Sequence, residues 1–210
     1  MSGNPVIGLI MATPLEAAPF IRELSLQPLE SRPFAVHGND RFAMILSGIG
    51  KANAAMACAY LIQTRRPSLI CNLGAAGAVD RRTRLGESYL IERVIEPDRP
   101  DLRSGLPRSH SPALLEGFAV ADLATHDRPL RDPQERECVA ASVHLVDMEG
   151  AAVAQACRRF GVRCFVFKFV SDTPDHRLNT EIIQNIERYR DAHARFFTDS
   201  VLPLLLPPGR

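Results

Sequence analysis

The stretch Cys164–Val170 reads Cys-Phe-Val-Phe-Lys-Phe-Val, a nearly uninterrupted apolar run with the length of a β-strand. Side chains of a strand alternate between its two faces, so this run needs an apolar layer on each side. Central strands of a parallel sheet that helices cover on both faces have this composition. Lys168 interrupts the run, and a charge in such a strand must have a partner or a functional role.

Short β-rich runs alternate along the chain with longer helical patterns, which is typical of βαβ units. We predict strands near Val6–Met11, Phe34–His37, Phe42–Leu46, Leu69–Leu73, Ser88–Ile95, Phe118–Leu123, His144–Val146 and Cys164–Val170. We predict helices over Pro14–Leu24, Lys51–Thr64, Pro133–Ala141, Glu149–Phe160 and Thr180–Leu205. The 210 residues can bury a substantial core. The expected fold is one α/β domain over residues 1–210, with a mixed, mostly parallel central sheet flanked by helices.

The segment from Pro97 to Pro112 has four prolines, mixed charges and no periodicity. These features predict a long loop within the domain rather than a linker between domains.

The charge balance excludes several classes of partner. The chain has 25 lysines and arginines against 24 aspartates and glutamates, a net charge of +1, so nucleic acid and anionic membrane surfaces are not expected partners. No segment approaches the roughly 18 apolar residues of a membrane span, and no basic leader precedes the first strand. We therefore expect a cytoplasmic protein with a small-molecule partner.

The cysteines give no sign of a metal site. Their number is odd and none forms a Cys-x-x-Cys pair, so we interpret them as buried thiols of a reducing compartment; they are Cys58, Cys71, Cys138, Cys157 and Cys164. No metal or other cofactor is predicted.

Thr13-Pro14-Leu15-Glu16 directly follows the first predicted strand. Threonine as N-cap, proline at the first helical position and glutamate three residues after the cap form a capping box, which is a purely structural interpretation. Alternatively, Glu16 lies at the carboxyl end of a parallel strand, where open α/β sheets bind ligands.

Two loops of small residues also begin at the ends of predicted strands. In Ser47-Gly48-Ile49-Gly50-Lys51 the glycines allow a close backbone approach, either for a tight turn or for a ligand. It is not a Walker loop, which needs four residues between its first glycine and the Gly-Lys pair. It is not the dinucleotide fingerprint either, because Asn53 replaces the third glycine. The second loop, which contains Ala76 and Gly77, could pack against a flat ligand or against a neighbouring helix.

Two acidic motifs complete the candidates. In Asp147-Met148-Glu149, helix capping accounts for one carboxylate better than for both. Ser171-Asp172 ends the apolar strand, where an Asx turn is an ordinary loop device but burial could also suit Asp172 to acid chemistry. Because the carboxyl ends of parallel strands meet at one edge of a sheet, we expect these motifs to converge.

At these residues the sequence resembles the purine nucleoside phosphorylase/uridine phosphorylase superfamily, and within it the 5′-methylthioadenosine/S-adenosylhomocysteine nucleosidases. The resemblance rests on five ordered motifs: "IGLIMATPLE", "LSGIGKANAA", "NLGAAGAVD…LGE", "VDMEGAAVAQAC" and "FKFVSDTPD". It implies a nucleoside substrate and a homodimer whose partner helps to close the pocket.

The resemblance also implies roles for individual residues. Glu16 would activate the attacking water and Ser47 would help to hold it. Met148 and Glu149 would bind the sugar, with Glu149 taking the 2′ and 3′ hydroxyls, while Asp172 would protonate or hydrogen-bond the purine N7. The substrate-binding set is completed by neighbours in the same motifs: Gly48, Ala76, Gly77, Lys168 and Ser171.

The sequence departs from the family at two places near these motifs. Lys168 stands where the nucleosidases carry arginine, which keeps the charge but loses the planar fork. Pro129-Leu130 stands where a Phe-Ile pair packs on the purine. The Pro97–Pro112 segment also differs from the region that shapes the 5′ pocket in the family.

The predicted reaction is hydrolysis of the N-glycosidic bond of a purine nucleoside, one modified at the 5′ position, with Asp172 assisting the base and Glu16 directing water. Phosphorolysis is the first alternative, although a carboxylate at the position of Glu16 would repel phosphate. A non-catalytic nucleoside-binding protein of the same fold is the second.

Overall fold

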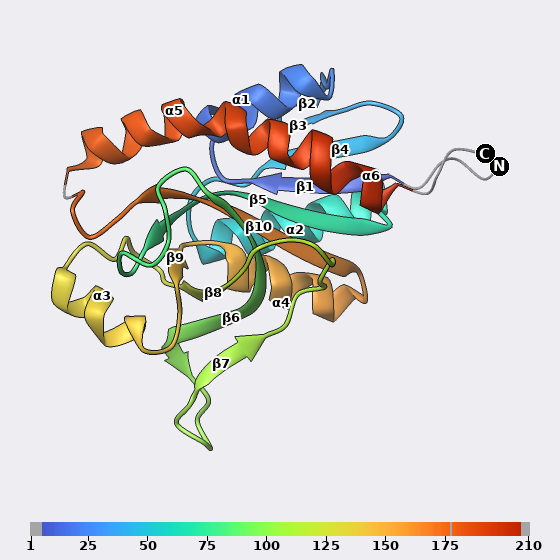
Figure 1. Ribbon diagram of the computed structural model, residues 1–210. Coiled ribbons are helices and arrows are strands. Elements are labelled where there is room, and N and C mark those ends of the chain that lie inside the picture. Colours follow the sequence, from blue (N-terminus) through green and yellow to red (C-terminus); the bar gives the residue numbers. More distant parts are fainter. Residues whose placement is uncertain (1–5, 177, 207–210) are drawn as a thin grey trace.

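The computed structural model describes residues 6–176 and 178–206 (Figure 1). Its strands are β1 (Ile7–Met11), β2 (Gln27–Glu30), β3 (Ala35–Gly38), β4 (Phe42–Leu46), β5 (Leu69–Ala78), β6 (Ser88–Pro100), β7 (Pro107–His110), β8 (Val120–Thr125), β9 (Leu145–Asp147) and β10 (Arg163–Asp172). Its helices are α1 (Pro14–Glu23), α2 (Lys51–Arg65), α3 (Pro133–Ala140), α4 (Gly150–Phe160), α5 (Asn179–Phe196) and α6 (Leu202–Leu205), with a π-helical turn at Phe197–Val201. The ends of the expected domain, residues 1–5 and 207–210, lie outside the described residues.

The expected mostly parallel sheet is wrong. Among the described strands, five pairings are parallel and five are antiparallel. The path β10-β6-β8-β9-β5 also closes on itself, because β10 pairs with β5 as well as with β6, so these strands form a barrel. The apolar pattern of β10 predicts that both faces are covered but does not specify the direction of its neighbours. One neighbour, β5, is parallel to β10, and the other, β6, is antiparallel.

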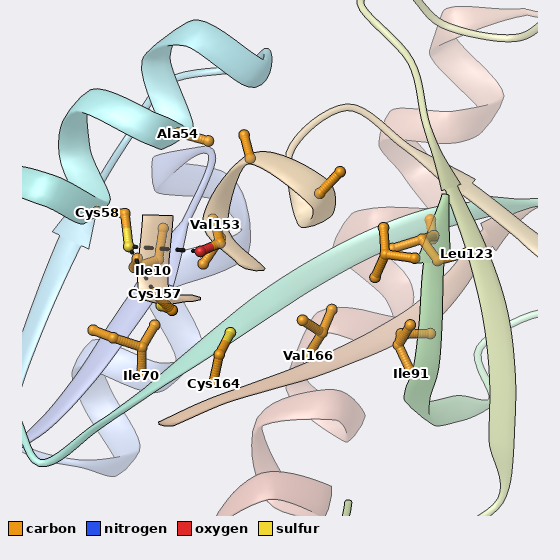
Figure 2. Close-up of a cluster of buried hydrophobic side chains, with 14 of the residues drawn as sticks. Ile10, Ala54, Cys58, Ile70, Ile91, Leu123, Val153, Cys157, Cys164 and Val166 are labelled. Carbon is orange, nitrogen blue, oxygen red and sulfur yellow. Dashed lines mark hydrogen bonds between the residues drawn. The ribbon is translucent and has the colours of Figure 1, made fainter. Parts of the chain in front are cut away.

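Helices cover both faces of the strands. In Figure 1, α1 and α5 lie together on one side, and α2 and α4 lie together on the other. The odd-numbered phenylalanines of β10, Phe165 and Phe167, pack toward Phe20 of α1 and Phe197 after α5. The even-numbered Val166 belongs to the buried cluster on the α2–α4 side, which also includes Cys58, Val153 and Cys157 (Figure 2). Burial of β10 on both faces is therefore confirmed.

The expectation of a long loop between Pro97 and Pro112 is also wrong. The strand β6 continues to Pro100 and pairs antiparallel with β7, with Pro100 opposite Pro107. Proline interrupts a ladder by removing a donor, but an edge strand tolerates it, so four prolines do not exclude this hairpin. The strand β2 also has no counterpart among the predicted strands, and the single helix expected over Thr180–Leu205 is divided by the π-helical turn.

The cysteines are free, and four of them are buried as expected. Cys138 is the exception, because α3 exposes it to solvent. Across the described residues, no helix is long and apolar enough to span a membrane.

Candidate active site

The start of α1 fulfils the capping-box interpretation and places Glu16 at the sheet edge at the same time. Thr13 Oγ1 accepts from the Glu16 backbone N–H, and Glu16 Oε2 accepts from the Thr13 backbone at 3.1 Å and from its hydroxyl at 2.6 Å. The other oxygen, Oε1, accepts from the backbone N–H of Ala75 at 2.9 Å. Glu16 is 6% exposed, so three hydrogen bonds fix a buried carboxylate at the end of β1 and β5.

The loop predicted after Leu73 is wrong, because β5 continues to Ala78 and includes Gly74 and Gly77. Within the strand, these glycines make room for two carboxylates. A Cβ added at Gly74 would lie 2.7 Å from Glu16 Oε1, and one added at Gly77 would lie 2.8 Å from Asp172 Oδ2. Real side chains do not approach so closely. The glycines therefore serve the approach of Glu16 and Asp172 rather than the packing of a neighbouring helix.

Glu149 precedes α4 and reaches the glycine loop before α2. Its Oε1 accepts from the backbone N–H of Gly50 at 2.9 Å. Burial and, after it, the nearby charge of Asp147 raise the pKa of Glu149 to about 7, against the opposing charge of Lys168. This carboxylate is 7% exposed and titrates close to neutral pH.

Lys168, the charge inside β10, finds its partner in Asp147. The Lys168 Nζ lies 2.9 Å from Asp147 Oδ2, and both side chains are buried. Asp147 also accepts from the hydroxyl of Thr125 at 2.6 Å and from the Gly150 backbone at 2.8 Å. Burial alone would lower the pKa of Lys168, but Asp147 and Glu149 raise it above its usual value. The lysine therefore stays charged and offsets the carboxylates around it.

Asp172 ends β10 after a slip of one residue in its pairing with β5. Its Oδ1 accepts from the Ser171 hydroxyl at 2.8 Å, and its Oδ2 accepts from Nη2 of Arg136 at 2.5 Å. Arg136 is 4% exposed and also donates to the carbonyls of Leu130, at 2.7 Å, and Ala78, at 2.8 Å. The helix α3 thus contributes a buried ion pair to Asp172.

One cavity of about 450 Å³ joins these groups. Of the residues that the sequence predicted, seven line it: Glu16, Ala76, Gly77, Met148, Glu149, Ser171 and Asp172. Pro129 and Leu130, which occupy the place of the purine-packing pair, line it as well. Separate strand-end motifs therefore meet at a single site, as expected.

Three predicted residues lie outside the lining: Ser47, Gly48 and Lys168. Ser47 is buried and donates from Oγ to the carbonyls of Met11, at 3.3 Å, and Gly48, at 2.8 Å. Gly48 bonds through its backbone N–H to the carbonyl of Ala12, which fixes the loop against β1. Ser47 and Gly48 therefore hold the loop in position without lining the cavity themselves.

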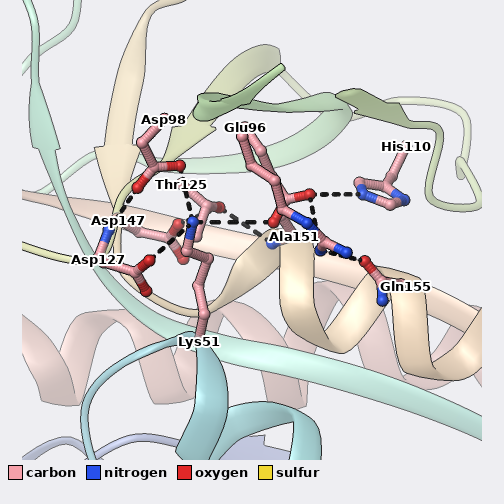
Figure 3. A network of polar contacts seen from close by, with 10 residues as sticks. Lys51, Glu96, Asp98, His110, Thr125, Asp127, Asp147, Ala151 and Gln155 are labelled. Carbon is pink, nitrogen blue, oxygen red and sulfur yellow. Dashed lines mark hydrogen bonds and ion pairs between the residues drawn. The ribbon is translucent and has the colours of Figure 1, made fainter. Parts of the chain in front are cut away.

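Lys51 contacts two aspartates from different segments, Asp98 and Asp127 (Figure 3). It begins α2, directly after the loop that holds Glu149, and its Nζ lies 2.7 Å from Asp98 and 3.3 Å from Asp127. Asp98 in turn accepts from the backbone N–H of Asp127 at 2.9 Å. Burial alone would lower the pKa of Lys51, but the hydrogen bond to Asp98 raises it above its usual value. The loop that contacts Glu149 and the segment before Pro129 are thereby tied together.

The sequence interpretation missed Arg136 and the apolar wall from α5. Arg136 is the one buried residue of α3, a polar helix whose pattern gives no sign of an inward face. Three isoleucines of α5 also line the cavity: Ile182, Ile183 and Ile186. Their helical spacing is visible in the sequence, but it also fits ordinary packing on the sheet. Within the described residues, no group of three or more His, Cys, Asp or Glu is placed to hold a metal ion.

Comparison with known proteins identifies a family. The profile of the family described as "Phosphorylase superfamily" matches residues 6–132 and 116–202. Among curated proteins, the 5′-methylthioadenosine/S-adenosylhomocysteine nucleosidase of Geobacillus thermodenitrificans (strain NG80-2) is 27% identical, over 77% of this chain and 78% of the relative.

Solved structures share the fold at lower identity. The apo 5′-methylthioadenosine nucleosidase of Arabidopsis thaliana aligns with a TM-score of 0.86 at 20% identity, covering 99% of this chain and 98% of that one. The futalosine hydrolase of Helicobacter pylori strain 26695 aligns with a TM-score of 0.84 at 19% identity, covering 95% and 98%. The barrel with flanking helices is therefore an arrangement shared by several nucleosidases.

Proposed function

The chain belongs to the phosphorylase superfamily, and from this membership and the cavity geometry we propose that it hydrolyses the N-glycosidic bond of a purine nucleoside and releases the base. The observation that carries the proposal is that Glu16, Glu149 and Asp172 line one cavity. The substrate we propose is modified at the 5′ position, of the methylthioadenosine or S-adenosylhomocysteine type, because the curated relative bears that name.

Glu149 holds the sugar in this proposal. A ribose offers two adjacent hydroxyl donors, and one carboxylate can accept both through charge-assisted hydrogen bonds. Gly50 occupies one acceptor position of Glu149, which leaves positions free on both oxygens. Met148 packs on the sugar, and the negative charge of Glu149 stabilises the cationic sugar that forms as the bond to the base breaks.

Glu16 activates the water. An ionised carboxylate has about four acceptor positions, and three of them are filled by Thr13 and Ala75. The remaining position belongs to Oε1, so the attacking water is held at a fixed place. As general base, Glu16 takes the proton of this water as the oxygen adds to C1′.

Asp172 acts on the leaving base. Arg136 and Ser171 each donate to one of its oxygens, which leaves acceptor positions on both for a ligand. As general acid, Asp172 passes a proton to the purine N7 as the bond to C1′ breaks, and the carboxylate that this leaves is stabilised by its ion pair with Arg136. Pro129 and Leu130 form the wall next to it.

Phosphorolysis remains the rival reaction, and the use of the lysines argues against it. A phosphate nucleophile needs free cations, whereas Lys168 pairs with Asp147 and Lys51 pairs with Asp98. Of the two arginines that line the cavity, Arg136 pairs with Asp172 and Arg131 is exposed to solvent. Glu16 stands where the nucleophile would enter and would repel an anion. A comparison of product formation with and without phosphate separates the two, since hydrolysis yields free sugar and phosphorolysis yields sugar 1-phosphate.

Glu16→Gln and Asp172→Asn test the roles directly. Glutamine can still serve in the capping box, so the fold of α1 is retained. Each variant should lower kcat by roughly 10²–10⁴-fold while nucleoside binding persists. Full activity of both variants would remove the assignment. Nucleoside binding by the wild type without any release of base would make the protein a binder rather than an enzyme.

A panel of nucleosides defines the substrate. Released base should be measured for methylthioadenosine, S-adenosylhomocysteine, 5′-deoxyadenosine, inosine and futalosine. A preference for futalosine or inosine would assign a 6-oxopurine in place of adenine.

We also propose that the chain forms a single domain over residues 1–210, that the protein is cytoplasmic, and that two copies form a homodimer. The argument for the homodimer is the rim of the cavity. Ile49 and Ile183 line the cavity and yet are 55% and 48% exposed, so the rim offers apolar surface to a second copy. Sedimentation of the wild type and of Ile49→Glu tests the dimer. A monomeric wild type would exclude it.

A further inference from the structure

A second cavity of about 500 Å³ lies between β7, α4 and β10. The residues that follow β7 line one side of it, the last turns of α4 line another, and the start of β10 closes it. Its lining includes three consecutive polar residues, Ser109, His110 and Ser111. The proposed nucleosidase chemistry uses none of these residues.

Two arginines without acidic partners face this cavity. Arg158 of α4 and Arg163 of β10 both line it. Neither guanidinium forms an ion pair or a hydrogen bond with any residue that the structure describes. Arg163 lies over the ring of Phe165, 5.3 Å from its centroid, which restricts the guanidinium without neutralising it. Two unneutralised cations at one concave site favour an anion.

His110 gives independent support. It is 6% exposed and lines the cavity, and neither of its ring nitrogens has a hydrogen-bond partner among the described residues. Its Nε2 lies 3.6 Å from a carboxylate oxygen of Glu96, an ion-pair contact (Figure 3), so Nδ1 is the ring nitrogen left without a polar partner among the described residues. A buried polar group without a partner is costly, and a bound ligand is one way to satisfy it.

The second cavity is separate from the proposed active site. Arg163 begins β10 and Asp172 ends it, so the two positions are about 30 Å apart along the strand. Likewise, Glu149 precedes α4 whereas Arg158 lies in its last turn. The cavity therefore occupies the opposite end of the same two elements.

We infer that this second cavity binds the phosphate group of a small metabolite, which Arg158 and Arg163 hold by charge-assisted hydrogen bonds and which His110 and the two serine hydroxyls help to orient. The arginine fork matches the oxygens of a phosphate. The volume exceeds that of phosphate alone and falls in the range of small-molecule sites, roughly 300–1,000 Å³, so a sugar or another small group accompanies the phosphate. No carboxylate is present among the residues that line the cavity.

Calorimetric titration of the purified full-length protein tests the inference. Inorganic phosphate, ribose 5-phosphate and uncharged ribose are the probes, with Arg158→Gln/Arg163→Gln as the test variant. Arg159→Gln is the matched control, because Arg159 is the next exposed arginine of α4 and does not line the cavity. Circular dichroism and the unfolding temperature in phosphate-free buffer verify that each variant is folded.

The wild type and Arg159→Gln should bind ribose 5-phosphate equally, with at least tenfold weaker binding in the double variant and none for ribose. Tighter binding of inorganic phosphate than of ribose 5-phosphate would assign the free ion as the ligand. Equal binding by the wild type and the double variant would overturn the inference, as would the absence of binding at tens of millimolar. Binding that is lost in Glu16→Gln but kept in the double variant would move the phosphate to the active site.

Discussion

Arg136 donates to Asp172 over 2.5 Å, and the two side chains, which are 36 positions apart, are both buried. The helix α3 is otherwise polar and half-exposed, so this pair is its main link to the cavity. Through this ion pair, α3 helps to position Asp172, the carboxylate that is proposed to act on the purine base.

Replacing Arg136 with methionine should leave Asp172 as a buried charge without a counterion. We expect a loss of ~3–5 kcal/mol in the free energy of unfolding, measured by urea denaturation. Asp172→Asn/Arg136→Met removes both charges and should recover most of that loss. Equal stability of Arg136→Met and wild type would show that the pair does not hold α3 in place.

Gly77→Ala should misplace Asp172 without unfolding the protein. The added Cβ would meet Asp172 Oδ2 at 2.8 Å, so the carboxylate must shift. A displacement of about 1 Å at a reacting group can lower the rate by roughly 10²-fold, and kcat measures it. When Gly77→Ala is combined with Asp172→Asn, kcat should fall little below that of Asp172→Asn alone, because the side chain that Gly77→Ala displaces is already inactive. Additive losses would contradict this explanation.

Substrate capture should weaken in acid through Glu149. Burial raises the pKa of Glu149 to about 7, so protonation below that pH removes acceptor capacity for the two sugar hydroxyls. In a pH profile, log(kcat/KM) should rise with a slope of about one up to pH 7 and then level off. Glu149→Gln should lower kcat/KM at all pH values and flatten this limb. A limb that persists in the variant would assign it to another group.

Stability should fall in acid through His193. Burial between Phe20, Phe169 and Phe196, together with the smaller effect of the charge of Lys168, lowers the pKa of His193 to about 3. The folded pKa is below the unfolded value of about 6.5, so the unfolded chain binds the extra proton between these values. The contribution is therefore complete above pH 6.5 and is lost as the pH falls toward 3, at up to about 1.4 kcal/mol per pH unit.

His193→Gln provides the comparison for that prediction. Glutamine can keep a hydrogen bond to Ser88, whose hydroxyl lies 2.9 Å from Nδ1 in the wild type, but it does not titrate. Denaturation curves at pH 7, 6, 5 and 4 should show a smaller loss for the variant than for the wild type. Parallel losses would assign the acid sensitivity to the carboxylates instead.

Periodicity and composition predict the elements of this fold better than their connections. The apolar run Cys164–Val170 correctly predicts a strand covered on both faces, since burial acts on side chains. Strand direction and ring closure depend on hydrogen bonds between segments far apart in the chain, such as β5 with β9, and local patterns do not encode them. The hairpin of β6 and β7 was obscured because its prolines also fit a loop.

For the candidate site too, the sequence predicts what depends on local position and misses what depends on tertiary structure. Glu16, Glu149 and Asp172 lie next to strand ends, so the sequence places them at one edge of the sheet. Lys168 shows the limit of that reasoning: its sequence position matches a substrate-binding residue of the family, yet its nearest partner is Asp147, outside the cavity. Arg136 lies in a polar helix whose inward orientation is set only by the tertiary structure.

Closure of the strand ring has a consequence for self-association. Among the described strands it leaves β2 and β7 with one unpaired side each, and β2 contains Pro28 while β7 begins at Pro107. A proline offers no N–H to an incoming strand, so both free borders resist extension by a second molecule. The architecture thereby discourages fibrillar aggregation at the two places where its backbone could still recruit another chain.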